Sequence, residues 1–119
     1  MITFTNASAY VLERFPELAN HIIFTEAPTL LFAELAEVTA EEITKSNKAF
    51  ILRIVNLIND TSENDNNEVQ GLISEFAITL FDLHKDEYAH FLSLLSTKAS
   101  HLFIENINLW RNNKLDNQS

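Results

Sequence analysis

The stretch "NEVQGLISEFAITLFDLH" at residues 67–84 decides how this chain folds. Its apolar residues recur at the spacing i, i+3, i+4 and i+7, which is the repeat of a helix with one face in a core. Gly71 lies early in this helix, where it costs about 1 kcal/mol relative to alanine, so we interpret it as a point of close helix packing. The apolar face consists of Val69, Leu72, Ile73, Phe76, Leu80 and Leu83.

Helical periodicity also dominates the chain before this stretch. Residues 47–60 carry an apolar arc so wide that we expect a central helix packed on two sides. Nearer the N-terminus, we expect a helix that starts at Asn6 or Ser8 and a second, short helix over residues 16–24. The next helix is expected to begin with Thr25 as its cap. Thr39 and Glu42 have the spacing of a capping box, which would restart or bend that helix.

After the stretch, the pattern predicts a shorter helix over residues 86–96, capped near Asp86, and a last helix over residues 96–110. The chain has only one Gly and two Pro, which argues against an all-β fold because strands need frequent turns. The predicted fold class is therefore all-α: a compact single-domain bundle or array of six to seven antiparallel or orthogonal helices. We place this domain at residues 1–112 and a frayed polar tail at 113–119.

Composition excludes several function classes. The chain has no Cys, so disulfides, thiolate metal sites and cysteine nucleophiles are absent. The start of the sequence lacks the features of a secretory signal, and no apolar run approaches the roughly 18 residues of a membrane helix. We therefore expect a cytoplasmic protein without membrane association. No phosphate loop or nucleophile elbow occurs, so we expect no catalytic residue and no cofactor.

The charge of the chain points to a basic partner. The formal net charge is −9, which disfavours nucleic acid and attracts a basic protein. The acids are also unevenly placed, because residues 15–44 and 54–84 contain no Lys or Arg. We expect this partner to be bound by Glu34, Glu37, Glu41 and Glu42 on one helix, and by Asp60, Glu63, Asp65 and Glu68 in a loop.

The polar run "INDTSENDNNEVQGL" at residues 58–72 has side-chain oxygens at alternate positions, as a calcium-binding loop does. Counted from Asp60, however, the sixth position is Asp65 where such a loop needs Gly, and the twelfth is Gly71 where it needs Glu. We interpret the run instead as a hinge of turn and cap residues. Asn66 or Asn67 is expected to cap the helix that follows.

One further cluster offers an alternative chemistry. Two histidines flank two acids across a predicted helix–helix junction, and together they define a weaker candidate metal or small-molecule site. The spacing fits neither HExxH nor two histidines four residues apart on one helix. We therefore assign no metal ligand from the sequence. The cluster consists of His84, Asp86, Glu87 and His90.

Three segments resemble a family of uncharacterised bacterial all-helical domains. That family often has an "fPEL" start, an acidic "gdeeVq"-like turn and a helix near "FLExL". The corresponding segments here are Phe15–Leu18, Asn66–Gln70 and Phe76–Leu80, with Ile78 where the family tends to have Glu. The resemblance covers most of the chain and implies a helical fold. Some such proteins are thought to be immunity proteins of toxin systems, and the resemblance implies no catalytic residue.

Taken together, these features favour a non-catalytic interaction protein. The leading hypothesis is an immunity protein that neutralises a bacterial toxin by placing its acidic surface against a basic toxin domain. The first alternative is a homodimeric helical adaptor or regulatory module. The second is the metal- or small-molecule-binding helical protein that the histidine cluster suggests. The sequence leaves monomer and homodimer both open.

Overall fold

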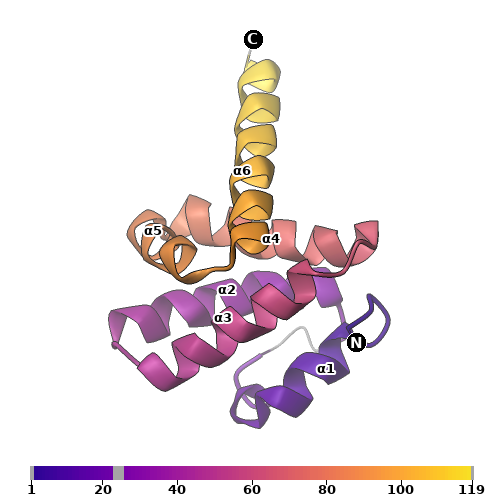
Figure 1. Cartoon of the computed structure of the whole chain (residues 1–119), viewed down its shortest axis with the longest axis vertical. Coiled ribbons are helices and arrows are strands. Elements are labelled where there is room, and N and C mark those ends of the chain that lie inside the picture. The colour runs from indigo at the N-terminus through magenta and orange to yellow at the C-terminus, as the bar shows by residue number, and fades with distance from the viewer. Residues whose placement is uncertain (1, 23–25, 119) are drawn as a thin grey trace.

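Six α-helices and one short 3₁₀ helix build the structure, a computed structural model that describes residues 2–22 and 26–118 (Figure 1). No strand occurs in these residues, so the predicted all-α fold is confirmed. The radius of gyration is 13.7 Å, close to the value of about 13.5 Å expected for one compact domain of this length. The elements are α1 (Ala7–Arg14), η1 (Pro16–Leu18), α2 (Pro28–Thr44), α3 (Lys48–Ser62), α4 (Asn67–Leu83), α5 (Lys85–Leu94) and α6 (Thr97–Gln118).

Helix α4 lies at the centre and packs mainly against α2 and α6. Its predicted apolar face is buried from Val69 to Leu80, as the spacing requires. Leu83 is the exception: it lies at the last position of the helix and its side chain is 56% exposed. Phe76 on α4 lies 5.4 Å from Phe91 and 6.0 Å from Phe103, measured between ring centroids. These rings join α4, α5 and α6 in one core.

Helix α3 confirms the wide apolar arc predicted for residues 47–60. Its buried residues span a wide arc, from Leu57 through Ile54 to Val55, and the helix packs against α2, α4 and α6. The side chain of Asn47 caps its start by accepting a hydrogen bond from the N–H of Phe50 at 3.3 Å. In Figure 1, α2 and α3 run side by side, whereas α6 stands upright across them and its C-terminal part projects beyond the other helices. The bundle is therefore partly orthogonal.

The prediction of a second α-helix at residues 16–24 is wrong for residues 16–22, the part that the structure describes. The 3₁₀ helix covers only Pro16–Leu18, with the N–H of Ala19 donating to the carbonyl of Pro16. One α-helical hydrogen bond follows, from the N–H of Ile22 to the carbonyl of Leu18, and the helix does not continue. The chain then turns, because Leu18 and Ile22 are both buried and anchor it to the core. Residues 23 and 24, and the expected cap Thr25, lie outside the described residues. Helix α2 begins at Pro28, a residue suited to the first helical turn.

The capping box expected within α2 is also wrong, because the helix continues without interruption to Thr44. Thr39 is fully buried, and its hydroxyl donates to the carbonyl of Leu35 at 2.7 Å. Inside a continuous helix no backbone N–H is free for a Thr side chain to cap. The helix ends at Thr44, and Ser46 two residues later has a φ of 58°, the left-handed conformation common after helix C-termini.

Asn66 caps α4, as predicted for Asn66 or Asn67. Its Oδ1 accepts hydrogen bonds from the N–H groups of Glu68 at 2.9 Å and Val69 at 3.2 Å. The hinge is also tied to the N-terminus, since the Asn64 amide donates to the carbonyl of Ile2 at 3.0 Å. The interpretation of Gly71 is wrong: a Cβ atom placed there would meet nothing within 4 Å. No helix approaches this glycine closely enough to require it.

The last two helices differ from the prediction at their ends. Helix α5 begins at Lys85 rather than at Asp86. The backbone of α6 stays helical to Gln118, through most of the segment predicted to fray, whereas Ser119 lies outside the described residues. No Gly or Pro follows Trp110, so no residue there stops helix propagation. The start of α6 is fixed by Asn59 of α3, whose Oδ1 accepts a hydrogen bond from the N–H of Ser96.

Candidate protein-binding groove

The glutamates of α2 line a hollow of about 510 Å³, which we call the acidic groove. Because α2 is continuous, Glu34 and Glu41 lie two turns apart on one side of the helix, about 10 Å along its axis. Glu37 and Glu42 lie between and beside them. Leu18 supplies apolar surface from the η1 turn across the groove. The full lining is Leu18, His21, Glu34, Glu37, Val38, Glu41, Glu42, Lys45 and His84.

The acidic groove carries strong negative charge. Its lining contains four glutamates and one lysine, a formal charge of −3 with neutral histidines. Lys45 offsets this negative charge only weakly, since its Nζ lies 3.9 Å from Oε1 of Glu42 and its side chain is mostly exposed. Glu42 is also bound by Asn47, whose amide donates to Oε2 at 2.7 Å. Glu37 and Glu41 remain exposed to solvent, so they are the carboxylates best placed to meet a partner.

Two histidines line the acidic groove, and sequence reasoning did not associate either with α2. His21 follows the η1 turn, and His84 lies at the junction of α4 and α5. No local spacing relates these positions to each other or to the glutamates, because the 3₁₀ turn and the helix packing bring them together.

The four acids expected in a loop lie outside the acidic groove, and the loop prediction is wrong for two of them, because Asp60 belongs to α3 and Glu68 to α4. Glu63 and Asp65 both approach Lys98 of α6, with oxygens 3.7 Å and 3.5 Å from its Nζ. Asp60 lines a separate hollow between α1 and α3, and Glu68 lines another beside residues 3–5. The structure therefore gathers four of the eight predicted partner-binding residues and spreads the other four over three places. Their role in binding stays a prediction.

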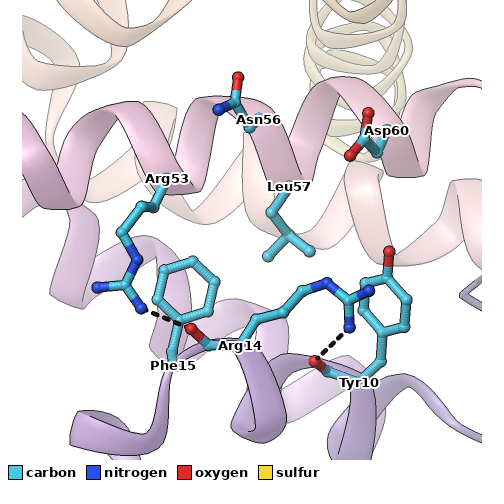
Figure 2. Close-up of a pocket in the computed structure, with 7 residues that line it drawn as sticks. All are labelled: Tyr10, Arg14, Phe15, Arg53, Asn56, Leu57 and Asp60. Carbon is cyan, nitrogen blue, oxygen red and sulfur yellow. Dashed lines mark hydrogen bonds between the residues drawn. The ribbon is translucent and has the colours of Figure 1, made fainter.

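A hollow of about 230 Å³ lies between α1 and α3, and Arg53 in its lining links the two helices (Figure 2). Arg53 donates to both carboxylate oxygens of Glu17 at 3.0 Å and to the carbonyl oxygen of Arg14 at 2.5 Å. Its guanidinium also lies 4.5 Å from the centre of the Phe15 ring. The hydrogen bond from Arg53 lowers the pKa of the Glu17 carboxyl below its ordinary value. Arg53 thus holds the end of α1 against α3.

The candidate metal cluster does not come together. Among the described residues, no group of three or more histidine or acidic side chains is arranged to hold a metal ion. His84 faces the acidic groove, whereas His90 lines a different hollow between α3 and α5. Glu87 accepts a hydrogen bond from the Thr44 hydroxyl at 3.4 Å. These positions leave no shared centre for a metal.

Comparison of the chain with protein-family models, curated proteins and solved structures found no match in any of the three. The expected membership of a bacterial all-helical family therefore stays a prediction. None of the helices in the described part of the chain is both long enough and apolar enough to cross a membrane. The geometry and charge of the acidic groove are the features of the fold that best indicate a function.

Proposed function

We propose that this chain is a non-catalytic protein-binding protein that captures a basic partner in the acidic groove. The observation that carries the proposal is the convergence of four glutamates from α2 in one hollow with a single lysine. Glutamates three and four residues apart on a helix repel one another, so the arrangement is slightly unfavourable in the free protein. A partner that supplies lysine or arginine would relieve this repulsion.

The groove suits a long basic side chain. Its volume of about 510 Å³ lies within the range of roughly 300–1,000 Å³ that is common for binding pockets. Leu18 and Val38 offer apolar surface against which the aliphatic part of an arginine or lysine can lie. The charged end would then meet Glu37 and Glu41. Such pairs also steer the encounter and raise the association rate at low salt.

The more specific proposal is that the chain neutralises a bacterial toxin, as an immunity protein does, and that the toxin domain is basic. Support comes from a helical scaffold with one continuous buried core and from the negative charge of the groove. An inhibitor of this kind must capture its toxin quickly, which complementary charge favours. The partner to test first is the protein encoded beside this chain.

The experiment compares variants that change net charge equally. Glu37→Gln/Glu41→Gln neutralises the groove, and Glu13→Gln/Asp82→Asn neutralises two exposed acids outside it. The groove variant should weaken binding to the neighbouring protein at least about tenfold, equivalent to 1.4 kcal/mol. The matched control should change binding by less than about threefold, since it alters only the long-range field.

A third variant, Glu63→Gln/Asp65→Asn, tests the loop acids separately. Both acids form ion pairs with Lys98, so neutralising them leaves the charge of Lys98 unpaired. The variant also removes any direct ionic contact that the two acids make with the partner. Equal losses from groove and control variants would contradict the groove as the binding site. Absence of binding to the neighbouring protein, together with no rescue of growth when both are expressed, would contradict the immunity function.

A further inference from the structure

A second hollow, of about 430 Å³, lies between α3 and α5 and is mainly apolar. Leu52 and Leu94 in its lining are 62% and 43% exposed, although both are large apolar side chains. Covering such surface is worth roughly 25 cal/mol per Å². We call this feature the apolar hollow. Its lining is Lys48, Ile51, Leu52, Val55, His90 and Leu94.

The lining of the apolar hollow contains one base, Lys48, and no acid. Of the four hollows described here, it is the one whose lining contains no carboxylate. This is notable in a chain with 17 acidic residues and eight lysines and arginines. Lys48 forms no ion pair with a described residue, whereas Lys45 and Lys98 each do. The occupant that fits is therefore apolar and carries a negative charge.

Helix α6 presents such a surface. Ile104 and Leu109 are 46% and 55% exposed, and the exposed Glu105 lies between them without an ion pair to any described residue. At 100° per residue, these three side chains fall within an arc of about 140°. The helix buries Phe103 and Ile107 on its other side. Figure 1 shows that the C-terminal part of α6 projects beyond the other helices.

We propose that the apolar hollow receives α6 of a second copy of this chain in a two-fold symmetric dimer. Ile104 and Leu109 of one copy cover Leu52 and Leu94 of the other, and Glu105 pairs with Lys48. Two-fold symmetry makes the contact twice and closes the assembly, so no further copies are added. The apolar hollow shares no lining residue with the acidic groove. The dimer and the proposed function therefore stand or fall separately.

The test is the mass of the full chain in solution, measured by light scattering after size-exclusion chromatography over a series of concentrations. A monomer has a mass of 13.6 kDa, and the dimer has twice that mass. Lys48→Glu and Glu105→Lys should each weaken dimerisation at least about tenfold. The combined Lys48→Glu/Glu105→Lys variant restores the pair with its charges exchanged, so its dimer should form about as well as the wild-type dimer.

Two controls complete the design. Lys85→Glu reverses an exposed base on α5 outside the hollow and should leave the dimer intact. Leu52→Asp should abolish the dimer while the monomer keeps its helical circular dichroism, because Leu52 is mostly exposed. A chain that is monomeric at every concentration overturns the proposal. So does a dimer insensitive to both single reversals, or a combined variant no better than the single ones.

Discussion

Asn66 holds the start of α4 with one side-chain oxygen that accepts two backbone N–H groups. Replacement by alanine leaves both N–H groups without this acceptor, so Asn66→Ala should lower the free energy of unfolding by about 1 kcal/mol. Urea unfolding followed by circular dichroism measures the change. Asn66→Asp keeps the acceptor and should unfold at nearly the wild-type midpoint. Asn67→Ala should also be nearly neutral, and a larger loss there than at Asn66 would reverse the assignment of the cap.

Gly71 gives a prediction of the opposite sign. The residue lies within α4, and a Cβ atom there would meet nothing within 4 Å. Gly71→Ala should therefore raise the free energy of unfolding by about 1 kcal/mol, because alanine loses less backbone freedom in a helix. The matched control is Ala89→Gly at an exposed position of α5, which should lower it by a similar amount. A destabilised Gly71→Ala would show that space at this position is limited.

At the scale of elements, α2 determines whether the acidic groove exists. A helix broken at Thr39 would separate Glu34 from Glu41, whereas the continuous helix places both in the groove. Among the described residues, the Thr39 hydroxyl bonds to the carbonyl of Leu35, which also lies within the helical hydrogen-bond ladder. Thr39→Val should therefore change the free energy of unfolding by less than about 1 kcal/mol. A loss of about 2 kcal/mol, as for a strong cap, would support a break in α2.

The contact between α1 and α3 depends more on Arg53 than on its acidic partner. Arg53 binds the carbonyl of Arg14 and covers the ring of Phe15 as well as pairing with Glu17. Arg53→Ala should lower the free energy of unfolding by about 1–2 kcal/mol. Glu17→Gln should lower it by less than about 0.5 kcal/mol, because both side chains are nearly half exposed and solvent screens the pair. Equal losses would mean that the ion pair alone holds α1.

The ion pair also has a pH dependence of known sign. Arg53 lowers the pKa of Glu17 in the folded protein, so the unfolded chain binds this proton more readily. The ion pair contributes to the free energy of unfolding above the ordinary pKa of a glutamate. This contribution is lost as the pH falls through the lowered pKa of Glu17 in the folded protein. The difference in unfolding free energy between wild type and Glu17→Gln should therefore be constant at neutral pH and should disappear as the pH falls below the ordinary pKa of a glutamate, about 4.3. A difference that grows on acidification would contradict the shift.

The sequence predicted elements better than their connections. Apolar spacing identified α3 and α4 because burial on a helix repeats every three to four residues. The same reasoning failed at residues 16–24, where two buried anchors force a turn that periodicity does not encode. It also failed at Thr39, where a residue with cap chemistry serves as a buried helix residue. The acidic residues of α2 were predicted as a set, but the groove needed His21 and Leu18, which only the folded chain brings near.

At the scale of the whole molecule, negative charge should weaken the fold slightly while it favours a basic partner. Neutralising Glu37 and Glu41 removes repulsion between neighbours on α2, which is worth about 0.2–0.5 kcal/mol per pair. Glu37→Gln/Glu41→Gln should therefore be at least as stable as wild type in urea unfolding at low salt. The difference should shrink in about 1 M salt, where charges are screened within a few ångströms. A marked destabilisation would show that these carboxylates support the fold.

The proposed role of the acidic groove is tested most directly by one ratio of dissociation constants. Titration calorimetry of the neighbouring gene's protein with wild type and with Glu37→Gln/Glu41→Gln gives this ratio at low salt. The account predicts at least about tenfold weaker binding for the groove variant, against less than about threefold for Glu13→Gln/Asp82→Asn. Equal dissociation constants for the groove variant and wild type, with both proteins folded, would contradict it.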